Sequence, residues 1–256
     1  MIQSLWRFCL FLMFALVGAE RTHAHDISQI NMPDLEWMPY FIKAENQVSG
    51  QGYAMDMLQK CFDEDQIKVK HVATSMKRAM QLMRDGSLDL WVFSHRKGRE
   101  DWLEYSEVPL LYDGYGVFVR ADSDFKYTEM KDLIGLKVGT LLGLKVSDEF
   151  QQFNAQHGVS HFSNERGLLL RLIQGHIDVA VIGMGAFSAV AKLENALDQI
   201  KLSGKPIRAK NYFATVSKRS KNITDRKAFL RDLDNCLSRL KSSIFIDGLY
   251  ETYFAN

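Results

Sequence analysis

Residues 75–106 read SMKRAMQLMRDGSLDLWVFSHRKGREDWLEYS, and this stretch predicts one unit of an α/β fold. Apolar side chains recur at the spacing of one helix face, at Met76, Ala79, Met80 and Met83. Gly86 follows where a helix end favours left-handed backbone geometry, and residues 88–93 read as a short buried strand. The polar loop after the strand carries Arg96 and Arg99. Ligands bind beyond the carboxyl ends of strands in open α/β sheets, so this loop is the first candidate for a binding site.

The same pattern recurs 89 residues later, counted from Gly86 to Gly175 (175 − 86 = 89). Residues 164–187 read NERGLLLRLIQGHIDVAVIGMGAF, which again predicts a helix, a glycine stop and a buried strand. The distance from Gly86 to Asp89 equals the distance from Gly175 to Asp178. Two such units favour two α/β lobes, although helix–glycine–strand segments also recur within single α/β domains.

The first unit carries residues that resemble those of a known family. A helix that ends in Gly-x-hydrophobic-Asp leads into a strand, and Arg99 stands seven residues before Ser106. From about residue 35 to about residue 254, the chain resembles the family 3 extracellular solute-binding proteins, the periplasmic amino-acid-binding type of ABC importers. Within this first unit it departs from the family pattern in two places. Glu104-Tyr105-Ser106 replaces Asp-Phe-Ser, and residues 94–98 lack the usual Thr-Pro-Glu.

The resemblance implies an α/β fold of the periplasmic binding protein type (type II). Two lobes, each a mixed sheet flanked by helices, would be joined by a hinge that the chain crosses twice in extended conformation. We expect residues 25–118 to form the first part of lobe 1, residues 119–210 to form lobe 2, and residues 211–256 to return to lobe 1.

The N-terminal residues predict export. Arg7 precedes an apolar run of ten residues, FCLFLMFALV at 8–17, which is shorter than a membrane-spanning helix requires. We expect residues 1–24 to be a signal peptide cleaved after Ala24, which would place the protein in the periplasm. Cleavage after Ala19 and retention as an uncleaved anchor are the alternatives.

The charge balance argues against nucleic acid as a partner. The chain has 32 Lys and Arg against 31 Asp and Glu, a net charge of +1. Residues 1–24 contain Arg7, Arg21 and Glu20, so the mature chain would carry +1 − 1 = 0. A neutral chain without a basic tract has no electrostatic footprint for nucleic acid. No second long apolar run follows, so we expect a soluble monomer.

Two cysteines remain after removal of the signal peptide with Cys9. Cys61 falls near the end of a predicted helix, and Cys236 falls in a predicted C-terminal helix that would return to the same lobe. An oxidising compartment allows a disulfide between them. Two buried free thiols are the alternative, because cysteine also packs as a small apolar residue.

Arg99 is the strongest candidate for ligand binding. A free carboxylate in a cleft is held best by a permanently charged, bidentate donor, which arginine supplies and lysine does not. The resemblance places Arg99 at the carboxylate-binding arginine of the family. The alternative is an exposed arginine in a charged loop, and Arg96 would then be the substitute.

Other candidates lie on predicted loops around the same cleft. The aromatic rings of Trp37 and Tyr40, beside Pro39, face the ligand in the resembling family, although they would equally well cap the core. Ser94 and His95 follow the predicted strand and carry hydrogen-bonding groups, while His95 reads equally well as a solvent-facing loop residue.

The second lobe contributes two further candidates and one departure from the family. A loop containing Gly143 precedes Ser147, which is a good N-cap for a helix that begins at Asp148, and helix N-termini bind anions. Ser147 has an equally good interpretation as a simple cap. In the family, an aspartate usually holds the ligand ammonium at the position of Gly183, so another acid serves or the ligand is not an ordinary amino acid.

The sequence therefore predicts a periplasmic solute-binding protein rather than an enzyme. It would capture a small polar ligand, anionic or zwitterionic, and pass it to the membrane subunits of an ABC importer. We assign no catalytic residue, metal site or cofactor. The first alternative is a dehydratase-like enzyme on the same fold, for which the acid–base candidates are Glu36, His95, Glu104 and Asp113. The second is a sensing module that acts through a partner.

Overall fold

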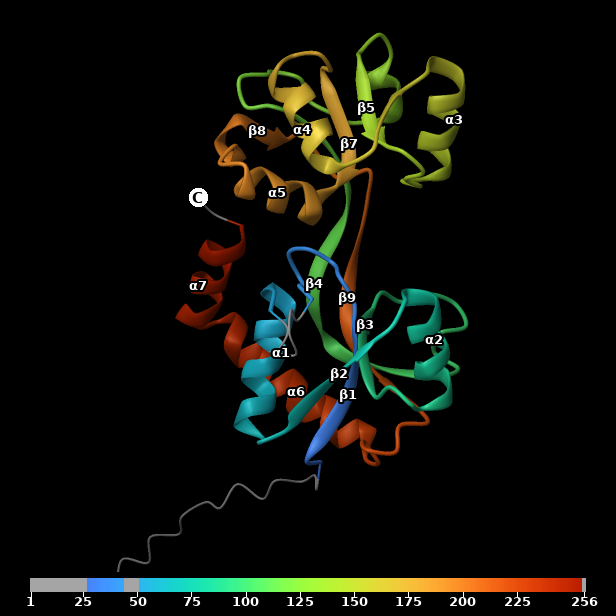
Figure 1. Cartoon of the computed structure of the whole chain (residues 1–256), viewed down its shortest axis with the longest axis vertical. Helices are drawn as coiled ribbons and strands as arrows, with labels where there is room; N and C mark the ends of the chain where they lie inside the picture. The colour runs from blue at the N-terminus through green and yellow to red at the C-terminus, as the bar shows by residue number, and fades with distance from the viewer. Residues whose placement is uncertain (1–26, 44–50, 255–256) are drawn as a thin grey trace, which may run out of the picture.

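The computed structural model describes residues 27–43 and 51–254. Two bodies, called lobe 1 and lobe 2 below, are joined by two long strands, β4 (Leu103–Arg120) and β9 (Arg208–Ser217) (Figure 1). These strands pair antiparallel from Leu103 with Ser217 to Tyr115 with Arg208. The connection between the lobes is therefore a two-stranded ribbon rather than a single linker.

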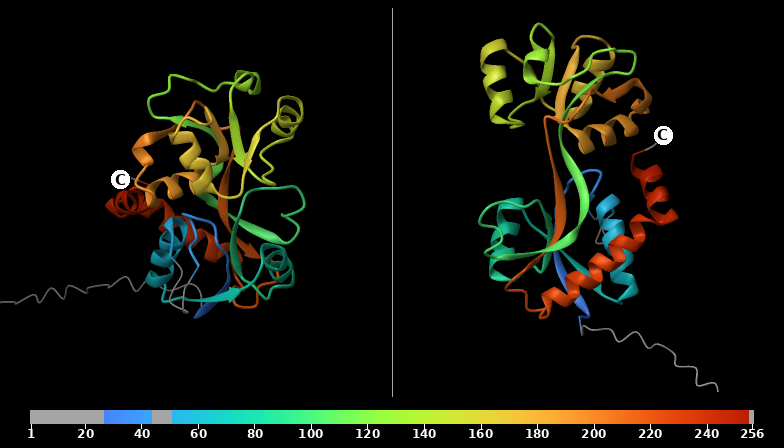
Figure 2. Two further views of the ribbon diagram at one scale, coloured as in Figure 1. Left: turned by 45° about the horizontal axis from the view of Figure 1, so that its top comes forward. Right: turned by 180° about the vertical axis from the view of Figure 1, so that it is seen from behind.

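Lobe 1 is built from the early and the final segments of the described chain. Its elements are β1 (Gln29–Asp34), α1 (Tyr53–Glu64), β2 (Lys68–Ala73), α2 (Met76–Asp85), β3 (Leu90–Phe93), α6 (Arg226–Lys241) and α7 (Ile244–Tyr253). The view from behind shows α1 and α6 packed side by side (Figure 2). Phe62, Trp91 and Leu237 are fully buried in one hydrophobic core that these elements share.

Lobe 2 is formed by the middle of the chain. Its elements are η2 (Met130–Leu133), β5 (Val138–Leu141), α3 (Asp148–His157), β6 (Ser160–Phe162), α4 (Glu165–Ile173), β7 (Val179–Gly183), α5 (Met184–Leu193), η3 (Leu197–Gln199) and β8 (Ile200–Leu202). One sheet of order β3-β9-β4-β7-β5-β6, with β8 paired to β4, runs through both lobes. It is mixed, because β4 is antiparallel to β7 and β9 while β6 and β7 are parallel to β5.

The sheet of lobe 2 is buried on both faces. Along β7, Val179 and Val181 belong to one hydrophobic cluster, whereas Ala180 and Ile182 belong to another. Successive side chains of a strand point to opposite faces, so the two clusters lie on opposite sides of the sheet. A strand covered on both faces reads as a continuous apolar run, which explains the DVAVI stretch of the sequence.

The two repeated aspartates have the same structural role in the two lobes. The buried carboxylate of Asp89 accepts a hydrogen bond from the backbone N–H of Asn31 at 2.7 Å, and the Asp89 N–H donates to the Asn31 carbonyl at 2.9 Å. Asp178 exchanges the same pair of bonds with Lys137, both at 2.8 Å. Each aspartate therefore fixes the start of its own strand to a neighbouring segment, which gives the repeated spacing a structural cause.

Helix α2 ends as the sequence predicts, and a serine caps its start. The Ser75 side chain accepts a hydrogen bond from the Arg78 N–H, and Gly86 closes the helix in left-handed conformation with φ of 82°. A Cβ atom on Gly86 would lie 2.0 Å from the carbonyl oxygen of Arg219. Only glycine meets both the backbone angle and this close approach.

The expected lobe boundaries at 118/119 and 210/211 fall inside β4 and β9, and they stay predictions. The predicted signal peptide, residues 1–24, lies outside the described residues. Among the helices that the structure describes, none is long and apolar enough to cross a membrane.

A disulfide joins Cys61 of α1 to Cys236 of α6, with the two Cα atoms 5.8 Å apart. Of the two alternatives for these cysteines, the structure has the bridge. The bond closes a separation of 175 residues between an early and a late helix of lobe 1. It therefore ties the returning C-terminal segment to the part of the lobe that precedes lobe 2.

Replacing both cysteines by serine should lower the free energy of unfolding by roughly 3–5 kcal/mol, because the bridge restricts the unfolded chain over a long loop. Denaturant unfolding of Cys61→Ser/Cys236→Ser beside the wild type measures this difference. Alkylation of the unreduced, denatured mature chain should label neither cysteine, and labelling of both would contradict the bridge.

Candidate functional site

A cleft of about 530 Å³ lies between the lobes. Lobe 1 lines it with Trp37, Met76, Met80, Val92, Phe93, Ser94, Arg96, Arg99 and Tyr212. Lobe 2 lines it with Leu141, Leu144, Glu165, Ile182, Gly183 and Ala186, and strand β4 supplies Asp113, Gly114 and Tyr115 where it crosses between the lobes. A concave site of this size suits a small molecule.

Arg99 lies in this cleft. One guanidinium nitrogen donates to the Ser94 carbonyl at 2.8 Å, and the guanidinium carbon stands 4.7 Å from the centre of the Phe93 ring. Among the described residues, none forms a salt bridge with Arg99. Its guanidinium is thus oriented by a carbonyl and a ring, and a carboxylate from a ligand would supply the missing countercharge.

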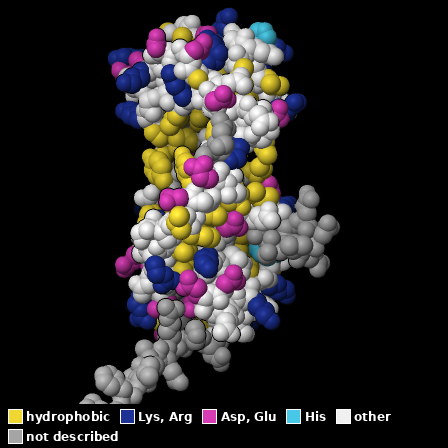
Figure 3. All heavy atoms as spheres, turned by 90° about the vertical axis from the view of Figure 1, so that its left-hand side faces the viewer, with side chains coloured by type: hydrophobic (Ala, Val, Ile, Leu, Met, Phe, Trp, Pro, Cys, Tyr) yellow, Lys and Arg dark blue, Asp and Glu magenta, His cyan; other side chains and the backbone are white. Residues whose placement is uncertain are grey.

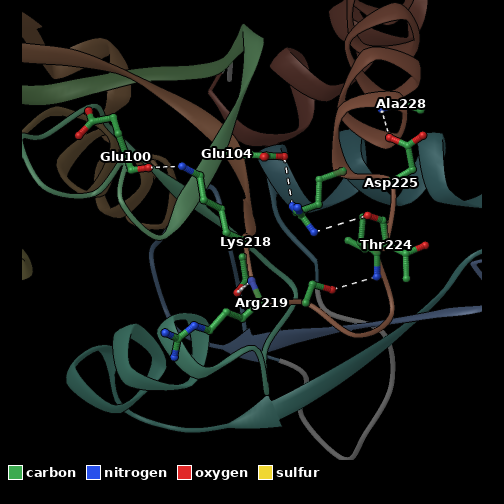
Figure 4. Close-up of polar contacts among 11 residues, drawn as sticks. Glu100, Glu104, Lys218, Arg219, Thr224, Asp225 and Ala228 are labelled. Carbon is green, nitrogen blue, oxygen red and sulfur yellow. Dashed lines mark hydrogen bonds and ion pairs between the residues drawn. The ribbon is translucent and has the colours of Figure 1, made fainter.

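The loop that carries Arg99 is fastened to the segment after β9 (Figure 4). The Lys218 ammonium donates to the carbonyl of Glu100 at 2.5 Å, and the Lys218 N–H donates to the carbonyl of Trp102 at 3.0 Å. Nearby, the Arg226 guanidinium lies 3.3 Å from the Glu104 carboxylate. A site residue on a loop needs such supports, because a mobile side chain loses entropy when a ligand fixes it.

Trp37 and Tyr40 occupy different surfaces of one short turn. Trp37 lines the cleft and packs edge-on against Tyr212, with the ring centres 4.8 Å apart. Tyr40 is 5% exposed and lies outside the cleft lining. Its hydroxyl instead donates a hydrogen bond to Asp113. Tyr40 therefore supports a residue of the cleft from behind.

Asp113 is a buried carboxylate at the centre of the hinge ribbon. It accepts a hydrogen bond from the backbone N–H of Gly185 at 3.1 Å, and Trp37, Tyr40 and the N–H of Gly114 stand near it as further donors. Burial raises the pKa of Asp113, and the hydrogen bonds offset only part of that increase. Burial and the neighbouring Asp113 charge also raise the pKa of Tyr40.

Ser94 and His95, which follow β3, lie in different surroundings. Ser94 is buried and lines the cleft. The His95 ring stacks on Tyr105 with the centres 4.1 Å apart, and its Nδ1 lies 3.8 Å from the carboxylate of Glu100. His95 lies outside the cleft lining, so its role in ligand binding stays a prediction that the geometry does not favour.

Ser147 and Gly143 also lie outside the cleft lining. The Ser147 hydroxyl accepts from the Phe150 N–H at 3.1 Å and so caps α3. Gly143 has a positive φ of 76° in the loop before it. From this loop, Leu144 reaches the cleft instead. The ligand-binding roles of Ser147 and Gly143 stay predictions.

Several cleft residues were not predicted as site residues from the sequence. Met76 and Met80 belong to the predicted apolar stripe of α2, but Met76 is 44% exposed and both line the cleft, while Ala79 and Met83 enter the core. The sequence did contain a signal for these two residues, because the apolar stripe of α2 is wider than the face of the helix that enters the core. Tyr212 reaches the cleft from β9, and no pattern in the sequence singled it out.

A second hollow, of about 500 Å³, lies behind the hinge and is bordered by Tyr40, Tyr53, Tyr112, Tyr250 and Phe254 among others. On the face that carries α7, hydrophobic side chains gather between the lobes (Figure 3). The Lys192 ammonium of α5 donates to the carbonyl of Glu251 in α7 at 2.7 Å. The lobes thus touch behind the hinge, while the cleft occupies its other side.

The family model of the bacterial extracellular solute-binding proteins, family 3, matches residues 32–256. The chain belongs to this family. The resemblance that the sequence suggested is thereby confirmed. No protein of curated function matches the sequence significantly.

Solved structures confirm the predicted fold class of this solute-binding protein. A polar amino acid ABC uptake transporter substrate-binding protein from Streptococcus thermophilus matches with a TM-score of 0.72 at 16% identity, covering 90% of this chain and 87% of that one. The unliganded, open L-cystine solute receptor of Neisseria gonorrhoeae matches with 0.70 at 16% identity, covering 91% and 95%. A histidine kinase sensor domain similar to periplasmic binding proteins matches with 0.57 at 16%, covering 90% and 96%.

Asp113→Asn should change how stability depends on pH. A raised pKa means that the folded state of the wild type binds a proton more readily than the unfolded chain, so ionising Asp113 costs stability as the pH rises. That cost is present at pH 7 and disappears as the pH falls towards the ordinary value of 3.8. The asparagine side chain of the variant carries no charge at any pH and so avoids this cost.

The stability of the Asp113→Asn variant relative to the wild type should therefore be greater at pH 7 than near pH 4. Urea unfolding of both proteins at the two pH values measures the difference, with exposed Asp124→Asn as the control. A relative stability that stays constant, or that rises on acidification, would contradict the raised pKa.

We expect submicromolar binding of none of the twenty common L-α-amino acids. Gly183 lines the cleft without a carboxylate. The acids that do line the cleft are Asp113, which is buried and already accepts a hydrogen bond from Gly185, and Glu165 in the first turn of α4. An ammonium at the Gly183 position would thus be desolvated without its usual partner. Calorimetric titration with each amino acid checks this, and one submicromolar affinity would overturn it.

Proposed function

We propose that this protein captures a small, polar, carboxylate-bearing ligand in the interlobe cleft and delivers it to the membrane subunits of an ABC importer. The observation that carries the proposal is Arg99, which lines the cleft without a salt bridge to any described residue. A bidentate pair between its guanidinium and a carboxylate would be shorter and stronger than a neutral hydrogen bond.

The hinge geometry supports capture by closure. Residues from both lobes line one cleft, so a ligand that contacts both walls binds a closed arrangement more tightly than an open one. That differential affinity is the free energy available to hold the lobes together. An importer would then recognise the closed, loaded form. The predicted signal peptide would deliver the protein to the periplasm, where such capture takes place.

The alternative of a ligand-sensing module has one supporting observation, the likeness to a histidine kinase sensor domain. The two roles share the same ligand cleft and differ in the partner. Copurification of the ligand-loaded protein with importer membrane subunits supports transport, whereas copurification with a receptor kinase supports sensing.

The enzyme alternative has weaker support in the geometry. Of its four acid–base candidates, only Asp113 lines the cleft, whereas Glu36, His95 and Glu104 do not. Asp113 would therefore have to act without a second acid–base group from this set beside it in the cleft.

The ligand can be found with a thermal-shift panel of small organic acids, amino acids and polyamines, because a ligand that binds only the folded state raises its apparent stability. The panel should single out carboxylate-bearing compounds. Stabilisation by polyamines alone would overturn the proposed function.

Arg99→Ala should weaken binding of the acid found in this way by about 2–5 kcal/mol, because the ligand carboxylate would lose its buried partner. Lys97→Ala is the matched control, since it removes one positive charge from the same loop at an exposed position outside the cleft lining. Calorimetry should show little change for Lys97→Ala. Unchanged affinity in Arg99→Ala would remove Arg99 from the site.

A further inference from the structure

We infer that the ligand carries a second anionic group, a carboxylate or a phosphate, and that Arg96, Arg208 and Lys210 bind this group in a basic pocket beside Arg99. The inference rests on the proposed function and narrows its ligand class to acids with at least two negative groups.

The basic pocket is continuous with the cleft. It has a volume of about 540 Å³ and is lined by Ser94, Arg96, Arg99, Asp113, Gly114, Tyr115, Lys145, Arg208, Ala209, Lys210 and Tyr212. Seven of these residues also line the cleft: Ser94, Arg96, Arg99, Asp113, Gly114, Tyr115 and Tyr212. A ligand held at Arg99 therefore has access to both spaces.

The register of the hinge ribbon places the positive charges. Asp113 of β4 stands opposite Lys210 of β9, and Tyr115 stands opposite Arg208. Opposed residues of an antiparallel pair share a face, and residues two apart along a strand share it as well. Arg208 and Lys210 thus project to the cleft side of the ribbon, beside Asp113 and Tyr115.

The positive charge in this pocket is not neutralised by the protein. Its lining holds five cationic side chains, Arg96, Arg99, Lys145, Arg208 and Lys210, against one carboxylate, Asp113. Within residues 27–43 and 51–254, none of the five forms a salt bridge. The whole chain has a formal net charge of only +1, so these five side chains are a marked local concentration of positive charge.

The same group of positive charges acts on Lys210. Partial burial lowers the pKa of Lys210, and the charges of Arg208, Arg99 and Arg96 lower it further. Like charges that disfavour one another in the absence of a ligand are stabilised together when an anion enters. A single carboxylate on Arg99 would leave Arg208 and Lys210 without a countercharge, whereas a second anionic group would supply one.

Pairs of probes that differ in one charged group test the inference. The carboxylate arm compares glutarate with glutaramate and L-glutamate with L-glutamine, and the phosphate arm compares 2-phosphoglycolate with glycolate. In at least one arm, calorimetry should show binding of the more anionic member at least about tenfold tighter, which is a modest gain for a charge pair in a partly desolvated site. The arm with the larger gain identifies the second group as carboxylate or phosphate.

The double variant Arg208→Gln/Lys210→Gln should reduce that preference to about twofold or less, because the larger loss of affinity falls on the more anionic member of each pair. Lys205→Gln, an exposed lysine outside both linings, is the control and should keep the preference. Equal affinity within every pair, or a preference that survives the double variant, would overturn the inference while leaving the proposed function intact. Failure of every acid to bind would overturn both.

Discussion

The hinge ribbon of β4 and β9 is the constraint on which the rest of the molecule depends. It carries the chain between the lobes in both directions, and it pairs with β3 on one side and with β7 and β8 on the other. A Cβ atom on Gly114 would lie 2.0 Å from the carbonyl oxygen of Arg208, so there is no room for a side chain at this point of the ribbon. The cleft is therefore centred on backbone that both lobes hold in place.

Strand register then decides the chemistry of the cleft. Because Asp113 and Tyr115 are two residues apart on β4, they face the same side as their partners Lys210 and Arg208. Tyr112, the residue before Asp113 on β4, points to the opposite side: it is 58% exposed and borders the hollow behind the hinge. A shift of one residue in this pairing would move the positive charges to the other face of the ribbon. The same hydrogen bonds that join the lobes therefore also set the electrostatics of the site.

Short sequence patterns predicted the features that depend on interactions between residues close together in the chain. Helix α2, its Gly86 stop and the two aspartates at Asp89 and Asp178 follow from short-range spacing and recur in the structure. The environment of Asp113 did not follow, because Trp37 and Tyr40 come from one turn and Gly185 from α5, and these segments meet only in the folded chain. The excess of positive charge around Arg208 and Lys210 could not be predicted from the sequence either, because it also depends on segments that meet only in the folded chain. The sequence shows a neutral chain, and only the register between β4 and β9 gathers the cations.

Asp113 and the cations of the cleft differ in how far the rest of the protein engages them. Asp113 is buried, and it accepts a hydrogen bond from the N–H of Gly185 near the start of α5, with the Trp37–Tyr40 turn close by. Gly183, at the end of β7, contributes only backbone. Arg99 and its basic neighbours, in contrast, form no salt bridge with the part of the chain that the structure describes. At these two positions a cation would meet no carboxylate at Gly183 and a buried, hydrogen-bonded one at Asp113, whereas an anion at Arg99 would meet several charged donors at once. The uncompensated positive charge beside Arg99 is therefore the feature of the cleft that supports the proposed acidic ligand.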